Sequence, residues 1–438
     1  MSLTILLCSL FKAQFGFKLL QRPLKPYVLC LTAVIYLTML YIFEMYEVRR
    51  RYEKTYIFAL LSAVSIVTFL IMFSLAKVIR INQATMVHIA IFFVFSIFFL
   101  HLWRMIFIKI FRRSEYFNKR VLFIGTDILT QAIIRESKDT DYNVQGLIPE
   151  NAEVSKDKCD LNILGNLNDL KSIMSLHKIQ VLVTACDTCL SADIIKQVYE
   201  YKLKGIQICD SIHFYEILTR KVPIRHYLEK NKLPYFNLNI FESSIFKNLK
   251  RAFDIIVATA LLIVLFPLFL MVAILVRLTS QGPIFYFQER LGFQENPFKL
   301  IKFRTMIKNA ESKTGPQWAL KEDRRVTRIG RFLRKTRLDE LPQFINILKG
   351  ELSFVGPRPI RKYFADIIEK QVPFYPLRFS IKPGLTGWAQ VHYDYGANIE
   401  GQVEKFQYDL YYLKHACFFL DLFIMLKTLQ TIVRRPAQ

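Results

Sequence analysis

Acidic residues are scarce in this chain of 438 residues, in which 36 Asp and Glu stand against 60 Lys and Arg and give a formal net charge of +24. An excess of positive charge on this scale indicates an anionic partner, which can be nucleic acid, an anionic membrane face or a phosphorylated substrate. Nucleic acid is the least favoured of the three, because the basic residues accompany long apolar segments. We therefore expect no nucleic-acid partner.

Cysteine is also sparse, and its pattern argues against a disulfide-rich domain and against a cysteine metal site. The seven cysteines are odd in number and scattered, which argues against a disulfide framework. Cys186 and Cys189 form a lone CxxC without a second pair, so buried thiols are favoured over a metal or redox site.

No small-residue cleavage site follows an apolar core, so we expect no cleavable signal peptide.

Long apolar stretches, in contrast, are abundant in the first quarter of the chain. Three of them are long enough to cross a bilayer as helices, at residues 27–46, 55–77 and 85–109. A fourth, at residues 2–20, is interrupted by two lysines. The basic segments 48–54 and 108–120 belong in the cytoplasm by the positive-inside rule. Residues 1–112 are therefore predicted to form a membrane domain with three or four spans.

The pattern changes to alternating strands and helices over residues 117–240. "RVLFIGTDILTQAIIRE" is typical of a strand, a turn and a helix, and a buried strand is expected at 179–187, followed by a helix that ends at Gly205 and another strand. This indicates an α/β parallel sheet that resembles a Rossmann-like domain. Gly125 stands alone where a GxGxxG phosphate turn needs three glycines, so a structural or regulatory role is favoured over dinucleotide binding.

A further apolar run occupies residues 250–276 and contains Pro267 near its centre. Proline removes a backbone hydrogen bond and clashes with the preceding turn, so the helix is expected to break there. A re-entrant membrane helix over about 250–278 is favoured, and a kinked span is the alternative. Lys250 and Arg251 at its mouth are expected to extend to lipid phosphates, with Asp254 one turn later pairing with them.

Asp339 and Glu340 are adjacent carboxylates that follow the basic run "RRVTRIGRFLRKTR". One interpretation is structural, with Asp339 as the N-cap of a helix that has Pro342 in its first turn and stops at Gly350. The other is catalytic, because an ionised Asp can attack phosphorus and form an aspartyl-phosphate. Two neighbouring anions also suit Mg²⁺, which takes one or two carboxylates together with substrate phosphates. The two interpretations are compatible.

Basic residues around this pair are expected to position phosphates and neutralise their charge. Two prolines would hold one of the arginines in a stiff extended turn. For each cation the alternative is a solvated surface charge. The candidates are Lys302, Arg304, Arg324 and Arg358, with Pro357 and Pro359 on either side of the last.

Several strings in the last 190 or so residues carry a resemblance to a known family. They are "QGPIFYFQERLG", "FKLIKFRTM", "EDRRVTRIGRFLRKTRLDELPQFINILKGELSFVGPRP" and "KPGLTGWAQV". Residues 245–435 closely resemble the bacterial sugar transferases, the polyprenyl-phosphate hexose-1-phosphate transferases, also called monotopic phosphoglycosyl transferases. The whole chain resembles the long form of this family, of the undecaprenyl-phosphate glucose or galactose phosphotransferase type.

The resemblance implies a fold and a set of site residues. The fold is a membrane protein with an α-helical transmembrane bundle, a Rossmann-like α/β domain and, over residues 245–438, a mainly α monotopic catalytic domain with a re-entrant membrane helix. Asp339 and Glu340 are implied to be catalytic and to bind Mg²⁺. Asp323 and Gln343 join the substrate-binding candidates because they lie inside the matching strings.

The implied activity is transfer of a sugar-1-phosphate from a UDP-sugar to a polyprenyl phosphate such as undecaprenyl phosphate. It would proceed through an aspartyl-phosphate on Asp339, release UMP and start a repeat unit of exopolysaccharide, capsule or O-antigen. The expected location is the bacterial inner membrane, with the catalytic domain facing the cytoplasm, and a homo-oligomer is left open. The alternatives are a membrane glycosyltransferase that releases UDP and an inactive scaffold or sensor.

Overall fold

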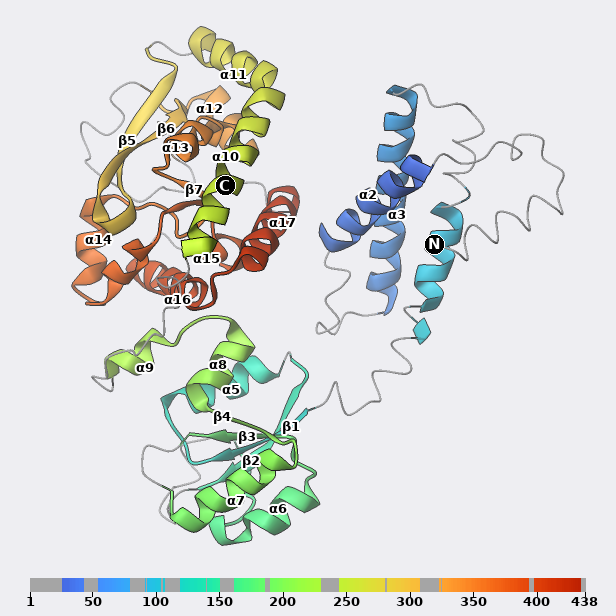
Figure 1. Ribbon diagram of the computed structural model, residues 1–438, viewed down its shortest axis with the longest axis vertical. Helices are drawn as coiled ribbons and strands as arrows, with labels where there is room; N and C mark the ends of the chain where they lie inside the picture. The colour runs from blue at the N-terminus through green and yellow to red at the C-terminus, as the bar shows by residue number, and fades with distance from the viewer. Residues whose placement is uncertain are drawn as a thin grey trace, which may run out of the picture. The chain divides into compact units, whose positions relative to one another are not determined.

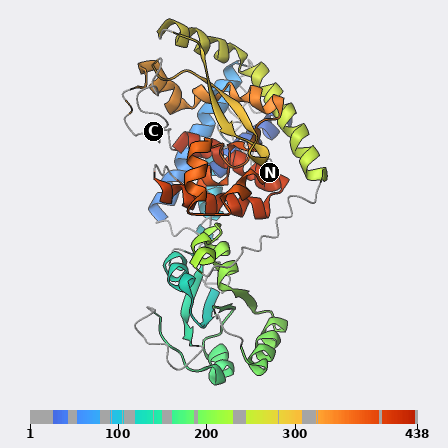
Figure 2. The same ribbon diagram turned by 90° about the vertical axis from the view of Figure 1, so that its left-hand side faces the viewer.

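The structure is a computed structural model, and it divides the chain into two compact units, Met1–Ser211 and Ile212–Gln438. The residues that it describes are 26–42, 54–78, 91, 93–103, 105–106, 119–138, 140–149, 161–185, 190–229, 244–279, 282–307, 323, 325–393 and 398–434. Figure 1 and Figure 2 show the helices and strands of both units from two directions.

The first unit opens with apolar helices that pack on one another. They are α2 (Pro26–Ile42), α3 (Lys54–Val78) and the helix Phe93–Trp103. The Tyr36 hydroxyl and the Ser65 hydroxyl form a hydrogen bond of 2.7 Å between α2 and α3, and the Phe93 ring meets the Tyr36 ring edge-on at 5.4 Å. Ser65 also donates to the Leu61 carbonyl at 2.9 Å, so each polar group in this apolar contact has a partner.

These helices coincide with the three predicted apolar stretches, whereas the stretch at residues 2–20 lies outside the described part of the chain. Among the described residues, no helix taken singly has the length and apolar composition to cross a bilayer, and one bent pair of helices does so jointly. That pair is in the second unit. Spans at 27–46, 55–77 and 85–109 therefore stay a prediction.

A parallel sheet of four strands forms the rest of the first unit. The strand order is β2-β1-β3-β4, and every neighbouring pair is parallel. Because β1 lies between β2 and β3, the chain reverses its direction of winding beside β1. The elements are β1 (Lys119–Ile124), α5 (Ile128–Ser137), β2 (Tyr142–Ile148), η4 (Leu167–Asp169), α6 (Leu170–Leu176), β3 (Val181–Thr184), α7 (Ala192–Leu203) and β4 (Gln207–Asp210).

The sheet confirms the predicted α/β pattern, and its core explains why the strands are apolar throughout. Leu122, Ile124 and Leu182 on the central strands are fully buried between helices that cover both faces. The helix α7 is followed by Gly205, whose φ of +87° lies in the left-handed region that ends helices. The single glycine at the end of β1, Gly125, also has a positive φ of 75°.

The second unit is mainly helical and contains two small sheets. β5 and β6 form an antiparallel hairpin, and β7 and β8 form a short parallel pair. The elements are α8 (Ser211–Thr219), α9 (Ile224–Glu229), α10 (Ser244–Val264), α11 (Phe266–Thr279), β5 (Phe285–Leu291), η6 (Phe293–Glu295), β6 (Pro297–Phe303), α12 (Arg328–Thr336), η7 (Leu338–Glu340), α13 (Gln343–Lys349), β7 (Ser353–Val355), α14 (Lys362–Glu369), η8 (Tyr375–Ser380), β8 (Gly384–Thr386), α15 (Trp388–His392), α16 (Ile399–His415) and α17 (Phe418–Arg434).

The segment after the parallel sheet packs on the second unit. Lys414 pairs with Glu216 at 2.8 Å, the Trp388 indole N–H donates to the Arg220 carbonyl at 3.0 Å, and Val222 joins an apolar core with α14 and α16. The compact second unit therefore begins at Ile212, so the last part of the predicted Rossmann-like range 117–240 belongs to it.

Candidate active site

The two adjacent carboxylates lie in one tight turn between two helices. Asp339 and Glu340 belong to the 3-10 turn η7, which follows α12 directly. Thr327 caps the start of α12 by accepting the Gly330 N–H at 3.0 Å. A Cβ on Gly330 would lie 2.1 Å from the Thr305 carbonyl oxygen, so glycine is needed for α12 to approach the end of β6. This close packing places the turn beside the hairpin.

The prediction that Asp339 caps a helix is wrong. The helix that follows, α13, begins at Gln343 with Pro342 as its N-cap residue. The intervening bonds are of the 3-10 type, such as the one from the Glu340 N–H to the Arg337 carbonyl at 3.2 Å. Proline has no N–H, so an α-helical ladder cannot run through this position. The predicted stop at Gly350 is confirmed, with φ of 86°.

Glu340 is held by two cations from different parts of the chain. Lys302, on β6, donates to the Glu340 Oε1 atom at 3.1 Å, and Arg358 donates to the same oxygen at 2.5 Å. Burial raises the pKa of Glu340, but the charges of Arg358 and Lys302 outweigh burial and hold that pKa well below its ordinary range. Glu340 is therefore ionised near neutral pH. Three predicted site residues are in direct contact here: Lys302, Glu340 and Arg358.

Asp339 has the opposite environment. Its residue surface is only 8% exposed, and among the described residues its carboxylate accepts no hydrogen bond and makes no ion pair. Burial raises the pKa of Asp339 from 3.8 to about 6, with Lys302 opposing the shift and the Glu340 charge adding to it. At neutral pH the carboxylate is ionised but poorly solvated. Such a group is a better nucleophile than one that is solvated or paired.

Arg358 reaches the turn from a loop that is fixed by its backbone. Arg378 donates to the Arg358 carbonyl at 2.9 Å and is itself paired with buried Asp409 at 3.0 Å. Arg290 donates to the Pro359 carbonyl at 3.1 Å, and the Pro357 carbonyl accepts the Gly384 N–H at 2.9 Å. The two prolines stiffen the chain between these bonds. The arginine side chain, 44% exposed, is thereby directed from a rigid loop towards solvent and Glu340.

Two positioning residues near the turn were missed by the sequence analysis. Arg334 on α12 donates to the Thr305 hydroxyl at 2.9 Å, and its charge lowers the pKa of Asp339. Asn346 on α13 is fully buried, accepts the Ile301 N–H at 3.0 Å and donates to the Lys299 carbonyl at 2.8 Å. It fastens α13 to the strand that carries Lys302. A lone Asn inside the apolar string "FINIL" was the available signal.

Among the described residues, the other charged substrate-binding candidates form no ion pair with Asp339 or Glu340. Asp323 forms a two-pronged pair with Arg325, with the closest approach at 2.6 Å, so its carboxylate is already used within its own segment. Arg304 is buried at the end of β6, close over Gly282, and burial lowers its pKa with the charge of Arg277 adding to the effect. Arg324 lies outside the described residues.

Gln343 and the prolines complete the set of predicted residues. Gln343 is buried at the first position of α13, and its Nε2 atom has no hydrogen-bond partner among the described residues. Pro357 and Pro359 act through their carbonyl groups, which receive the bonds described above. The structure therefore assembles Asp339, Glu340, Lys302 and Arg358 directly.

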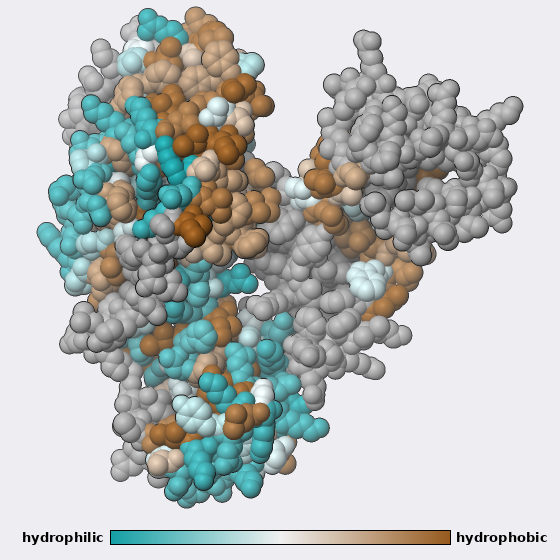
Figure 3. All heavy atoms as spheres, viewed as in Figure 1, coloured by the Kyte–Doolittle hydropathy of each residue, from teal (hydrophilic) through white to brown (hydrophobic). Residues whose placement is uncertain are grey.

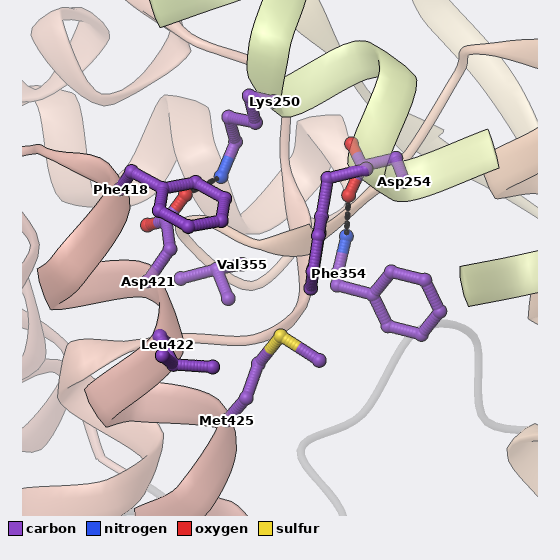
Figure 4. Close-up of a pocket in the computed structure, with 9 residues that line it drawn as sticks. Lys250, Asp254, Phe354, Val355, Phe418, Asp421, Leu422 and Met425 are labelled. Carbon is purple, nitrogen blue, oxygen red and sulfur yellow. Dashed lines mark hydrogen bonds and ion pairs between the residues drawn. The ribbon is translucent and has the colours of Figure 1, made fainter. Parts of the chain in front are cut away.

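The charged residues near the start of α10 form their contacts with other elements of the second unit and not with one another. The predicted pairing of Asp254 with Lys250 and Arg251 is wrong: Lys250 pairs with Asp421 on α17, and Asp254 accepts the Phe354 N–H at 3.2 Å (Figure 4). These contacts join residues far apart in the sequence, and no helical periodicity encodes them. They surround a cavity of about 10 Å³. That volume suits a single water molecule and excludes a nucleotide sugar.

Arg251 is used in the same way and does not extend freely from the helix. Its guanidinium donates to the Ile347 carbonyl at 2.6 Å and the Leu348 carbonyl at 2.7 Å. Both belong to the last turn of α13, where carbonyls have few backbone partners, although the Ile347 carbonyl also accepts the Gly350 N–H at 3.0 Å. A cation at this end is also favoured by the helix dipole. Arg251 therefore fixes α10 to the helix that follows the two carboxylates.

The apolar helix is broken where the sequence predicts. α10 ends at Val264, α11 begins at Phe266, and the two axes differ by 65°. Pro267 sits in the first turn of α11, where its missing N–H costs least. Apolar side chains on this pair face outward, and Figure 3 shows hydrophobic residues gathered over it. The most exposed are Ile245, Ile256, Ile263, Val264, Phe266 and Leu278.

The turn offers a donor set that fits Mg²⁺. Both cations bind Glu340 through its Oε1 atom, and the Oε2 atom accepts no hydrogen bond among the described residues. Together with the Asp339 carboxylate it supplies oxygens of the kind that Mg²⁺ binds through one or two carboxylates plus phosphates. A cluster of three or more His, Cys, Asp or Glu side chains is not found in the described part of the chain. The remaining ligands would have to come from substrate and water.

With this geometry established, comparison with known proteins defines the class. The family model for bacterial sugar transferases matches residues 245–435, which include the whole carboxylate turn. The chain is 32% identical over 325 residues to the UDP-glucose:undecaprenyl-phosphate glucose-1-phosphate transferase of Escherichia coli (strain K12), covering 72% of this chain and 68% of that protein. The chain belongs to the bacterial sugar transferase family.

Two other relatives match a shorter part of this chain at higher identity. The UDP-N-acetylgalactosamine-undecaprenyl-phosphate N-acetylgalactosaminephosphotransferase of Aeromonas hydrophila is 41% identical over 218 residues, which is 50% of each chain. The uncharacterized sugar transferase EpsL of Bacillus subtilis (strain 168) is 41% identical over 186 residues, which is 42% of this chain and 87% of EpsL. The match thus spans about half the length of the Aeromonas relative.

A second family model, described as a CoA-binding domain, matches residues 41–209. The start of α5 does not fit the pyrophosphate of coenzyme A. The Asp127 carboxylate already accepts the Leu129 N–H at 3.1 Å and the Thr130 N–H at 3.0 Å, and it also accepts the Ser211 hydroxyl. The chain's own anion therefore occupies the helix end where a phosphate would bind. This agrees with the isolated Gly125 of the sequence.

Proposed function

We propose that this protein transfers a sugar-1-phosphate from a UDP-linked sugar to undecaprenyl phosphate, the first step in building a polysaccharide repeat unit. Relatives that are named for this kind of reaction support both substrates. The observation that carries the proposal is the contrast between the two carboxylates. Glu340 is pinned by two cations, whereas buried Asp339 accepts no hydrogen bond from the described residues.

In the first step, an Asp339 carboxylate oxygen attacks the β-phosphorus of the donor. A bond forms between that oxygen and phosphorus, and the bond from phosphorus to the bridging oxygen breaks. UMP leaves with the electron pair, and the sugar phosphate stays on Asp339 as an acyl phosphate. The raised pKa of Asp339 reflects the burial of its carboxylate. The ionised carboxylate is therefore poorly solvated, and this makes it more reactive towards phosphorus.

In the second step, a phosphate oxygen of undecaprenyl phosphate attacks the same phosphorus. The bond to Asp339 breaks, the carboxylate is regenerated, and a lipid diphosphate sugar is formed. Arg358 and Lys302 stabilise negative charge at the turn through both steps, while Arg334 lies close enough to affect the charge of Asp339.

We infer that Asp339 and the Oε2 atom of Glu340 hold Mg²⁺ together with the donor phosphates. When bound, the ion would neutralise charge on the phosphates and so favour the departure of UMP. Glu340 keeps its own cations during this, because both donate to its other oxygen.

We also infer that α10 and α11 form a re-entrant element that enters and leaves the cytoplasmic leaflet of the inner membrane. The 65° bend and the exposed apolar side chains on both helices support it. The contacts of Lys250 and Arg251 fix the start of α10 to the catalytic unit, so the membrane element and the carboxylate turn form one rigid arrangement. A buried lipid and a soluble nucleotide sugar could then meet on one membrane face.

The experiment is to identify the released nucleotide. Purified protein in lipid nanodiscs is mixed with undecaprenyl phosphate, Mg²⁺ and either UDP-glucose or UDP-N-acetylgalactosamine. We expect UMP in a one-to-one ratio with a lipid diphosphate sugar. Release of UDP with a lipid monophosphate sugar would establish glycosyl transfer instead. Absence of any nucleotide release with either donor would contradict both substrates proposed here.

A further inference from the structure

Arg337 has an unusual backbone conformation at the entrance to the carboxylate turn. Its φ of 57° and ψ of 16° place it in the left-handed region, which is uncommon for a residue with a long side chain. The Arg337 N–H donates to the Arg334 carbonyl at 3.1 Å, and the Arg337 carbonyl accepts the Glu340 N–H at 3.2 Å. The backbone is therefore fixed on both sides. Strained residues of this kind cluster at functional sites.

The guanidinium of Arg337 is close enough to be affected by the charges of both carboxylates, but it forms no ion pair with either among the described residues. Its Nε atom is buried and has no hydrogen-bond partner among the described residues. Glu340 already holds Lys302 and Arg358 on one oxygen. Burial lowers the pKa of Arg337, with the Glu340 charge opposing that shift and the Arg358 charge adding to it. A buried Nε donor without an acceptor is costly, and it is available to a ligand that brings oxygen acceptors to the turn.

The charges around the turn indicate what that partner is. Among the described residues, four cations act on the two carboxylates, an excess of two positive charges; the cations are Lys302, Arg334, Arg337 and Arg358. A nucleotide diphosphate sugar carries one negative charge on each of its two phosphates. The forked guanidinium is also the side chain best suited to phosphate oxygens.

We propose that Arg337 binds the diphosphate of the nucleotide-sugar donor, with its guanidinium donating hydrogen bonds to phosphate oxygens. This rests on the proposed function, because it assumes that the carboxylate turn is where the donor binds. Within that site, Glu340 organises Lys302 and Arg358, whereas Arg337 forms no ion pair among the described residues and is available to the donor. The charges of Glu340 and Asp339 both act on Arg337, so its guanidinium lies near the turn.

A purely structural role predicts something different. If Arg337 served only to shape the turn, a residue that tolerates the left-handed region without a cation would do as well. Asn and Gly both adopt this conformation more readily than Arg. The variants Arg337→Asn and Arg337→Gly therefore keep the turn and remove the guanidinium. Arg331→Asn is the matched control, because Arg331 is exposed on α12, in the same basic run.

The test measures binding of UDP, which carries the diphosphate but no sugar to transfer, by calorimetry with the full-length protein in nanodiscs. We expect Arg337→Asn and Arg337→Gly to weaken UDP binding about 10- to 100-fold. They should lower kcat/KM for the UDP-sugar by a similar factor, while the KM for undecaprenyl phosphate and the Tm stay unchanged. Arg331→Asn should bind UDP within about twofold of the parent protein, and Arg337→Lys should recover part of the loss.

Failure of this inference is distinguishable from failure of the proposed function. If the parent protein releases UMP and both Arg337 variants bind UDP as tightly as Arg331→Asn does, Arg337 does not bind the donor and the function stands. If UDP binding depends on Arg337 but neither donor yields a nucleotide product, the function is wrong and the binding site stands. A fall in Tm in the Asn and Gly variants with unchanged UDP affinity would assign Arg337 to the fold alone.

Discussion

At the scale of single residues, the site depends on two neighbouring carboxylates with opposite environments. Asp339 is buried without a hydrogen bond from the described residues, and Glu340 next to it is bound by Lys302 and Arg358. The backbone conformation does not explain this difference, because both residues belong to the same turn. The difference lies in the side chains: Glu340 forms ion pairs with the two cations, and Asp339 does not. Asp339 therefore stays reactive, while Glu340 positions the cations.

The raised pKa of Asp339 predicts a pH dependence of activity. Because the nucleophile must be ionised and its pKa is about 6, kcat/KM for the donor should fall about tenfold per pH unit below that value. The pKa of Glu340 lies far lower, so it should not add a second ionisation in this range. The measurement is a pH–rate profile between pH 5 and 8. A flat profile across that range would argue against Asp339 as the ionising group.

The same shift predicts how Asp339→Asn changes stability. A carboxyl group whose pKa is raised in the folded state destabilises that state above its folded pKa, and the penalty disappears as the pH falls towards the unfolded value of 3.8. Asp339→Asn should therefore abolish turnover and raise the free energy of unfolding by about 2–3 kcal/mol at pH 8. Urea unfolding should show no such gain near pH 4. A destabilised variant at pH 8 would contradict the desolvated carboxylate.

Glu340 and Arg358 should behave as one unit. Glu340→Gln removes the charge that holds Lys302 and Arg358, and Arg358→Gln removes one of those cations, so each change should lower kcat by about 100- to 1,000-fold. In the double variant the losses should not multiply, because both changes break the same pair. Steady-state rates of the four proteins measure this coupling. Losses that multiply fully would show that the pair does not act jointly.

At the scale of secondary-structure elements, α10 is joined to α13 by one arginine. Arg251 donates charge-assisted hydrogen bonds to two carbonyls at the C-terminal end of α13, so Arg251→Gln should lower the free energy of unfolding by about 1–3 kcal/mol. The control is Lys349→Gln, which removes an exposed cation from the same helix end. Thermal unfolding of the three proteins gives the comparison. Equal Tm values for the two variants would show that Arg251 adds nothing beyond surface charge.

Sequence periodicity predicted some elements well and could not predict others. The buried strands β1 and β3 and the break before Pro267 follow from local patterns, namely apolar runs and a proline inside a helix. The pairing of Lys250 with Asp421 joins positions 171 residues apart, and no local pattern encodes it. The 3-10 turn at Asp339 was missed because a helix cap and a 3-10 turn before a proline look alike in sequence.

At the scale of the whole molecule, the proposed arrangement puts both ends of the bent helix pair on the cytoplasmic face. In cells expressing a variant without native cysteines, single cysteines at exposed positions Asn248 and Glu289 should both resist an impermeant thiol reagent until the cells are opened. A cysteine at position 83, which the sequence topology places outside, should react in intact cells. Labelling of Glu289→Cys but not Asn248→Cys from outside would show that the pair crosses the membrane.

Asp339 is proposed to carry the sugar phosphate during turnover, and mass spectrometry tests this directly. The protein is incubated with UDP-sugar and Mg²⁺ without undecaprenyl phosphate, quenched rapidly, and digested for mass spectrometry. We expect the peptide containing Asp339 to gain the mass of one sugar phosphate, UMP to be released in equal amount, and added lipid phosphate to remove the adduct. Asp339→Asn should show neither adduct nor UMP. Rapid turnover with lipid phosphate and no adduct on Asp339, or an adduct that persists in Asp339→Asn, would contradict the account.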